Sequence, residues 1–307
     1  MGECMSEDYK IIEKYIDGSK VRYDEPMSKH TTLKVGGNAD VLVLPETIED
    51  VQKILTYTKE NKIPLTVIGN GSKLLVLDKG IRGVVIKFGS RFANVQVSGE
   101  YISVYAGMTM PHLAIIAKDN SLSGLEFAAG IPGNVGGGIY MNAGAYGSEM
   151  SNVVEEVTYI DENLNVVTAS KEQCKFAYRR SMFKGTNNII LFAKLKLKTG
   201  SKEEIHALMK QNNEARKSKQ PLEYPSAGST FKRPEGYFVG KLIDDLGLRG
   251  HKIGNAQIST KHSGFIVNTG NAKASDVMKL INFVKEKVLE TEGIMLEEEI
   301  IVLGEGE

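Results

Sequence analysis

The chain has little of three features that would narrow its function at once: cysteine, net charge and metal-binding spacing. Its two cysteines, Cys4 and Cys174, stand far apart without a CxxC pattern, so we expect reduced thiols rather than a disulfide framework. Lysine plus arginine and aspartate plus glutamate both number 38, which gives a formal charge of zero and no global field to attract nucleic acid. None of the five histidines stands in a spacing such as H-E-x-x-H, and we expect no metal.

Several sequence motifs are also missing. No segment approaches about 18 uninterrupted apolar residues, and the start, MGECMSEDYK, lacks the basic region and apolar run of a signal peptide. We therefore expect a cytoplasmic protein without membrane insertion. No G-x-G-x-x-G follows a clear strand, and neither G-x-x-x-x-G-K-[ST] nor G-x-S-x-G occurs. These absences argue against a Rossmann domain, a P-loop and that type of serine hydrolase.

The most informative stretch is glycine-rich and covers 124–147, GLEFAAGIPGNVGGGIYMNAGAYG. Small side chains allow positive φ angles and let a ligand approach the main-chain N–H groups. Pro132 fixes φ where a helix can begin. A flexible linker would carry Ser, Glu or Lys between its glycines, whereas this stretch carries Ile, Val, Met and Phe. We expect an anion-binding loop that enters a short helix.

A second glycine turn, GNGSK at 69–73, follows an apolar run at 65–68 that reads as a buried strand. Such a turn at the carboxyl end of a strand offers several N–H groups and a hydroxyl to a diphosphate. Alone it also fits a plain tight turn. Together with 124–147, it predicts a second wall of one anion site.

Periodicity predicts an alternation of helices and strands. Thr47 should cap a helix, and with the flanking apolar runs this segment predicts a β-α-β unit. We expect a packing helix near 9–16, a strand, turn and strand over 31–44, a meander over 84–106, and a hairpin from VVEEVTYI to NVVTA. Further helices are expected near 111–119, 201–217, 237–246 and 277–288, and further strands at 189–198, 253–259, 263–268 and 300–303.

Three polar residues stand in apolar or glycine-rich settings and are candidates for chemistry. They are Arg179 in YRRSMFK, Ser229 in AGSTFKRP and Glu299 in MLEEEIIV. Each also fits a plain structural role: a surface pair, a turn, and one member of a solvated run of three carboxylates. We give them weight only when they are read together with the two glycine loops.

At this point seven motifs stand in order between His30 and Gly304: HTTLKVGGNAD, GNGSKLLV, the glycine-rich stretch, YRRSMFK, AGSTFKRP, AQISTKHSGFIVN and LEEEIIVLGE. Together they resemble the UDP-N-acetylenolpyruvoylglucosamine reductase (UDP-N-acetylmuramate dehydrogenase) family, in the shorter form that lacks an inserted tyrosine-bearing loop. The resemblance implies an α+β fold. The fold that the resemblance implies consists of an FAD-binding domain of the vanillyl-alcohol-oxidase (PCMH) type in two subdomains, followed by a C-terminal α+β substrate-binding domain. We predict an N-terminal helical segment at 1–30, the subdomains at 31–105 and 106–200, a linking helix at 201–214 and the substrate-binding domain at 215–307.

The activity that the resemblance implies is a reduction by NADPH through FAD. The enolpyruvyl group of UDP-N-acetylenolpyruvoylglucosamine would become UDP-N-acetylmuramate, in peptidoglycan precursor synthesis and hence cell-wall biogenesis, cell shape and division. Hydride would come from flavin N5 and the proton from Ser229. Arg179 would hold the substrate carboxylate, and Glu299, if kept protonated, could donate as well. We expect a monomer.

The resemblance also implies binding residues. For FAD these are Gly36, Gly69, Asn70, Gly71, Ser72, Lys73, Gly130, Pro132, Gly133, Asn134, Gly136, Gly137, Asn142, Ala143 and Gly144; for the substrate they are Tyr178, Arg233 and His262. Two positions depart from the common family pattern, because Lys73 and Arg233 stand where Asn is frequent. Arg233 is expected either to reach the substrate diphosphate or to be an exposed rim charge.

Two other functions remain open on the sequence. One is a flavin oxidase of an alcohol or sugar lactone on the same cofactor fold, which would keep the glycine loops but would not need the YRRS, AGST and LEEE motifs. The other is a binding or scaffold protein that has lost its cofactor. The joint presence of the YRRS, AGST and LEEE motifs argues against the oxidase, and the intact glycine loops with all three catalytic candidates argue against the scaffold protein.

Overall fold

The computed structural model describes residues 9–306, so Cys4 lies outside the described part of the chain. These residues form two compact units. Unit 1 contains the described part of 1–22 together with Leu42–Asn70 and Val84–Arg216. Unit 2 contains Tyr23–Val41, Gly71–Gly83 and the chain from Lys217 onward. Because each unit is assembled from separate segments, the units differ from the contiguous domain ranges predicted from the sequence.

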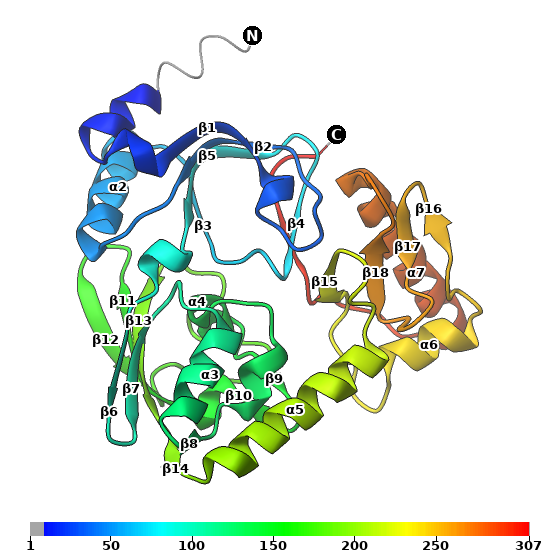
Figure 1. The fold of residues 1–307 in the computed structure, drawn as a ribbon. Helices are drawn as coiled ribbons and strands as arrows, with labels where there is room; N and C mark the ends of the chain where they lie inside the picture. Colours follow the sequence, from blue (N-terminus) through cyan, green and yellow to red (C-terminus); the bar gives the residue numbers. More distant parts are fainter. Residues whose placement is uncertain (1–8, 307) are drawn as a thin grey trace. The chain divides into compact units, whose positions relative to one another are not determined.

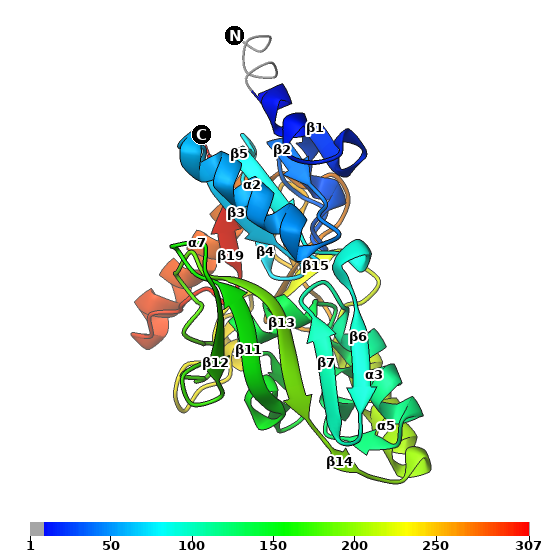
Figure 2. The same ribbon diagram turned by 90° about the vertical axis from the view of Figure 1, so that its left-hand side faces the viewer.

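Unit 1 contains a five-stranded antiparallel sheet of order β12-β11-β13-β7-β6 (Figure 2). Leu191, Ala193 and Leu195 of its central strand are all 0% exposed, the period of two that a strand with one buried face requires. Helices α3 and α4 lie on one side of this sheet (Figure 1). The strands are β6 (Val95–Ser98), β7 (Tyr101–Tyr105), β11 (Val154–Ile160), β12 (Val166–Ser170) and β13 (Ile189–Lys196). Short pairs join β8 (Leu122–Ser123) to β14 (Lys198–Thr199) and β9 (Gly144–Ala145) to β10 (Ser148–Glu149).

The helices begin where capping residues end the preceding loops. Thr47 accepts a hydrogen bond from the N–H of Asp50, and the Asp50 carboxylate accepts from the N–H of Thr47, which completes a capping box. Thr109 caps the next helix, which carries a proline in its first turn. The helices predicted near 48, 111–119 and 201–217 are confirmed. The bounds are α2 (Ile48–Glu60), α3 (Met110–Asp119), α4 (Val135–Tyr140) and α5 (Lys202–Lys219), with 3-10 turns η1 (Lys10–Lys14), η2 (Gly18–Lys20), η3 (Met27–Lys29), η4 (Ser90–Phe92), η5 (Glu126–Gly130) and η6 (Met150–Asn152).

A four-stranded sheet has the order β1-β2-β5-β3, and the boundaries between the units fall inside β1, β2 and β5. Strand β3 pairs in parallel with β5, with Leu65 opposite Val84. The predicted β-α-β unit is present as β2, α2 and β3, and in the sheet β5 lies between β2 and β3. The bounds are β1 (Val21–Pro26), β2 (Asn38–Val43), β3 (Leu65–Ile68) and β5 (Ile81–Lys87).

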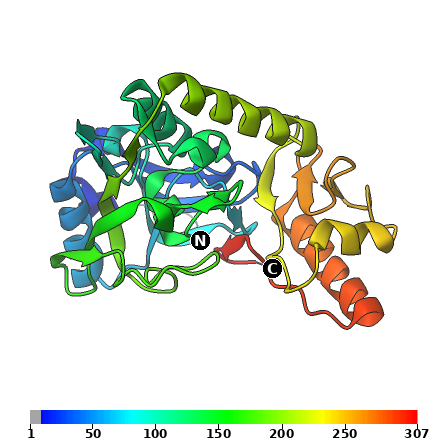
Figure 3. The same ribbon diagram turned by 90° about the horizontal axis from the view of Figure 1, so that it is seen from below.

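Unit 2 contains the sheet β15-β18-β17-β16, with helix α7 running alongside it (Figures 1 and 3). The buried residues of α7 recur at helical spacing, as the sequence predicts, and include Val277, Leu280, Ile281, Val284 and Val288. A parallel pair joins β4 to β19, with Leu74 opposite Ile301. The bounds are β4 (Leu74–Val76), β15 (Ser226–Ser229), α6 (Val239–Asp245), β16 (Lys252–Ile253), β17 (Ala256–Ile258), β18 (Phe265–Asn268), α7 (Ala274–Glu292) and β19 (Ile301–Leu303).

Three local predictions are wrong. The expected strand before Gly36 is irregular, because Lys34 has φ +55° and Gly36 has φ +129°, which end an extended chain. The packing helix near 9–16 is a 3-10 turn, Lys10–Lys14. The expected meander over 84–106 is divided, since β5 belongs to the four-stranded sheet while β6 and β7 pair in the five-stranded one.

Candidate active site

Two glycine-rich loops of unit 1 contact each other directly. The side-chain amide of Asn70 donates to the carbonyl oxygen of Pro132 at 2.6 Å. A Cβ at Gly69 would lie 3.1 Å from the Oδ1 atom of Asn134, which is tighter than an ordinary contact. Residues 69–70 and 130–138 are therefore held side by side, as expected for two walls of one site.

The first turn of α4 is bonded to the connection after β7. The N–H of Val135 donates to the carbonyl of Met108 at 2.8 Å, and the N–H of Gly136 donates to the carbonyl of Ala106 at 3.0 Å. These two N–H groups are therefore used within the fold, and the anion-binding role expected of the loop stays a prediction. The open position is Gly137, where a Cβ would meet no heavy atom within 4 Å.

Asn134 carries a feature that points to a ligand. Among residues 9–306, its buried Oδ1 has no hydrogen-bond partner, while its Nδ2 donates to the carbonyl of Gly107. A buried acceptor without a donor costs about 1–3 kcal/mol. FAD carries hydroxyl and ring N–H donors that would remove this cost. With the open face at Gly137, these residues fit FAD.

The other predicted cofactor residues have structural roles of their own. A Cβ at Gly71, which has φ +64°, would lie 2.2 Å from the carbonyl oxygen of His30. A Cβ at Gly136 would lie 2.9 Å from the Cβ of Ala106. Glycine is therefore needed at both positions for packing, whatever binds there. Contact with the cofactor stays a prediction for these two glycines and for the whole predicted set. The members in unit 1 are Gly69, Asn70, Gly130, Pro132, Gly133, Asn134, Gly136, Gly137, Asn142, Ala143 and Gly144, and those in unit 2 are Gly36, Gly71, Ser72 and Lys73.

Arg179 stands at the tip of a tight turn in unit 1. Ala177 and Arg180 exchange backbone hydrogen bonds at 3.0 Å in both directions, and Arg179 takes the left-handed conformation with φ +54°. Its guanidinium donates to the carbonyl of Gly144 at 3.3 Å and lies 5.0 Å from the ring centroid of Tyr178. Tyr178 is 54% exposed. The structure therefore fixes Arg179 against the end of the glycine-rich stretch.

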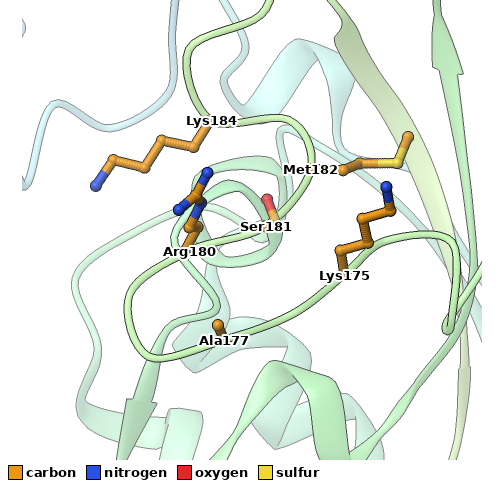
Figure 4. Close-up of a pocket in the computed structure, with 6 residues that line it drawn as sticks. All are labelled: Lys175, Ala177, Arg180, Ser181, Met182 and Lys184. Atoms are coloured by element: carbon orange, nitrogen blue, oxygen red, sulfur yellow. The ribbon is translucent and has the colours of Figure 1, made fainter.

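A hollow of about 280 Å³ lies in the same segment (Figure 4). It is lined by Lys175, Ala177, Arg180, Ser181, Met182 and Lys184. Three of the six are cations, and Figure 4 shows Arg180 beside Lys184 with Lys175 at the other end. Arg179 is not among the lining residues. The hollow is a cationic surface next to the Arg179 turn and does not include the glycine loops.

Unit 2 brings Ser229 and Glu299 together. The N–H of Glu299 donates to the carbonyl of Thr230 at 2.8 Å, which ties Glu299 to the residue after Ser229. The ammonium of Lys73 lies 2.7 Å from the Oε1 of Glu299 and donates to the carbonyl of Ser229 at 2.9 Å. Gly228 has φ +74° within β15, and a Cβ there would lie 3.3 Å from this ammonium. Lys73 was assigned to the cofactor from its motif, whereas its side chain contacts the two catalytic candidates.

The remaining substrate candidates, Arg233 and His262, also lie in unit 2. The Arg233 guanidinium lies 3.7 Å from the ring centroid of Phe238 and donates to the carbonyl of Tyr237 at 3.2 Å. Burial lowers the pKa of His262, whose Nδ1 accepts from the N–H of Gly264 at 3.1 Å. Substrate contact by either residue stays a prediction.

Comparison with known proteins decides the family. The sequence is 48% identical to UDP-N-acetylenolpyruvoylglucosamine reductase of Caldanaerobacter subterraneus over 96% of this chain and 97% of that protein. The chain belongs to the UDP-N-acetylenolpyruvoylglucosamine reductase family. The reductase of Syntrophomonas wolfei is 46% identical over 97% of this chain and 99% of that protein. The solved structure of the Thermus caldophilus reductase has a TM-score of 0.80 and 38% identity, over 92% of this chain and 98% of that one.

Family models match two parts of the chain. One for an FAD binding domain matches 39–170, and one for the C-terminal domain of UDP-N-acetylenolpyruvoylglucosamine reductase matches 220–303. The predicted family, the α+β class with its FAD-binding domain, and a flavin-dependent oxidoreductase are thereby confirmed. The second model spans Ser229 and Glu299, the two candidates that unit 2 brings together.

The sequence interpretation missed what Lys73 and Asn142 do. Lys73 is the residue just before β4, and Glu299 lies two residues before β19. The parallel pairing of these two strands therefore brings the two side chains together. No local pattern predicts that pairing. Asn142 has φ +44° and is 0% exposed, and both ends of its side-chain amide are bonded within unit 1. An asparagine within a run of small residues was the available signal.

Proposed function

We propose that this protein reduces the enolpyruvyl group of UDP-N-acetylenolpyruvoylglucosamine to give UDP-N-acetylmuramate, with NADPH as the reductant. The observation that carries the proposal is full-length similarity to reductases of this name, joined to the Ser229, Glu299 and Lys73 arrangement within unit 2. The reaction would lie in peptidoglycan precursor synthesis, and hence in cell-wall biogenesis and division. We propose a cytoplasmic monomer. In the described part of the chain, no helix combines the length and apolar character needed to span a bilayer.

The residues supply orientation, charge and a proton. When bound, FAD supplies the hydride, which reaches the CH2 carbon of the enolpyruvyl group. The neighbouring carbon, which bears the carboxylate, must then take a proton, and the Ser229 hydroxyl is the proposed donor. Arg179 presents a planar fork of N–H donors that suits the substrate carboxylate and stabilises charge that develops beside it. Asn134 and the open face at Gly137 would hold FAD in unit 1.

The salt bridge to Lys73 changes the role proposed for Glu299. An ionised carboxylate only accepts hydrogen bonds. Glu299 in this pair therefore orients donors and balances charge near Ser229 rather than supplying a proton itself. That leaves Ser229 as the proposed source of the proton.

Half-reactions followed by rapid-mixing absorbance test this function. NADPH should bleach the flavin under anaerobic conditions, and UDP-N-acetylenolpyruvoylglucosamine should restore its colour faster than air does. Ser229→Ala should leave bleaching nearly intact and slow recolouring by about 10²–10⁴-fold, the usual contribution of a general acid. Ser229→Cys, which keeps a proton on a side chain of similar size, should recover part of the rate. Unimpaired recolouring of Ser229→Ala would remove Ser229 from the mechanism, and faster recolouring of the wild type by oxygen would favour an oxidase.

A further inference from the structure

The run of three glutamates before β19 is not a uniform solvated face. Each carboxylate pairs with a lysine from a different segment: Glu297 with Lys232, Glu298 with Lys285 and Glu299 with Lys73. Their side chains are 70%, 29% and 7% exposed, respectively. Only the last pair has a nearly buried carboxylate, and only its lysine also donates to the backbone of Ser229. The Lys73–Glu299 pair therefore differs from the two neighbouring pairs in the burial of its carboxylate and in its hydrogen bond to Ser229.

Stability does not explain this third pair. Burying a carboxylate beside an ammonium costs about as much solvation energy as the pair returns, so such pairs are weak contributors to folding. The Lys73–Glu299 geometry is nevertheless fixed from several sides. The carbonyl of Lys73 accepts from the N–H of Ile301 at 2.7 Å, and the absence of a side chain at Gly228 leaves room for the ammonium.

We propose that Lys73 is a positioning residue for proton delivery: its ammonium holds the Glu299 carboxylate and the backbone of Ser229 in one fixed arrangement. The proposal rests on the proposed function, in which Ser229 donates a proton to substrate carbon. Lys73 acts through Glu299 and Ser229 and touches neither the reacting carbon nor the hydride. Its contribution therefore belongs to the recolouring half-reaction and not to bleaching by NADPH.

Lys73→Met removes the charge and keeps a long unbranched side chain. We expect flavin occupancy and bleaching by NADPH to stay within about twofold of wild type, and recolouring by UDP-N-acetylenolpyruvoylglucosamine to slow on the order of 10²-fold, as for a misplaced reacting group. Lys73→Arg, which restores a cation, should recover most of the rate. The matched control is Lys285→Met, which breaks the neighbouring pair with Glu298 and should recolour like wild type.

A double variant shows whether Lys73 acts through Glu299. Adding Lys73→Met to Glu299→Gln should slow recolouring little beyond Glu299→Gln alone, because interacting groups are not additive. Three results would each overturn the proposal. The recolouring losses of the two single variants could multiply in the double variant, Lys73→Met could recolour as fast as Lys285→Met, or Lys73→Arg could fail to restore the rate. A colourless Lys73→Met would instead make Lys73 a cofactor residue. Should Lys73→Met not fold, Lys73→Gln, which keeps a donor for the Ser229 carbonyl, replaces it in every comparison. A wild type whose flavin the substrate does not recolour would refute the proposed function rather than this role of Lys73.

Discussion

The side-chain amide of Asn142 donates to the carbonyl oxygen of Ala177 at 3.1 Å, which joins the glycine-rich stretch to the turn that carries Arg179. On its other side, the Oδ1 of Asn142 accepts from the N–H of Ser151 at 2.9 Å. Both bonds lie within unit 1, and Asn142 is 0% exposed. A residue predicted to bind FAD thus also supports the geometry of a catalytic candidate.

Replacing Asn142 with Ala should destabilise unit 1. The change removes two partly buried hydrogen bonds, each of which contributes about 0.5–1.5 kcal/mol to the unfolding free energy. Urea unfolding measures the loss. The control is Asn120→Ala at the end of α3, where an exposed amide donates to the carbonyl of Ile116 at 2.8 Å, and its effect should stay within about 0.5 kcal/mol. Equal effects at both sites would refute the bracing role of Asn142.

Cys174 should be unreactive in the folded protein. It is 0% exposed, and burial raises the pKa of its thiol to about 11. Since the thiolate is the reactive form, iodoacetamide at pH 8 should leave Cys174 unlabelled in the native protein and label it fully in urea. Mass spectrometry of the peptide that contains Cys174 checks both. Rapid native labelling would show that this part of unit 1 opens readily.

The lowered pKa of His262 predicts that the folded protein loses stability in acid. Burial lowers its folded pKa below the ordinary value of 6.5, so at pH values between the two the unfolded chain binds more protons. The unfolding free energy therefore falls as pH drops below about 6.5. Thermal unfolding at pH 7.5 and pH 5.0 should show a larger difference in Tm for wild type than for His262→Asn. The control is His206→Asn in α5, an exposed imidazole, which should show the wild-type difference.

Local signals predicted the elements well. Thr47 and Thr109 mark the starts of α2 and α3, and the apolar spacing of α7 predicts its buried face. What the sequence could not show is pairing over distance. Strand β4 lies beside β19 although more than two hundred residues separate them, and only that pairing brings Lys73 to Glu299. For the same reason, the sequence does not distinguish the three adjacent glutamates at 297–299, although their side chains differ widely in burial.

Glycines illustrate a second limit. The sequence treats Gly71, Gly136 and Gly137 alike, as small residues near a ligand. Gly71 and Gly136 are packed so tightly that a Cβ would lie 2.2 Å and 2.9 Å from neighbouring atoms, whereas Gly137 has open space. Valine at either of the first two positions would disturb the fold itself, so loss of flavin there would not identify the site.

Gly137→Val is therefore the informative test of the FAD site. A Cβ at this position meets no heavy atom within 4 Å, and valine is no worse than glycine in a helix interior, so the variant should fold with a Tm near that of wild type. Its branched side chain would project from the face beside Asn134 that FAD is proposed to occupy, and the protein should purify without the visible flavin band. The control is Gly89→Val, also in unit 1 and also open within 4 Å, which should keep full flavin content. Absorbance spectra of both variants, with circular dichroism for folding, give the answer. A yellow, fully loaded Gly137→Val protein would place FAD away from this face of α4.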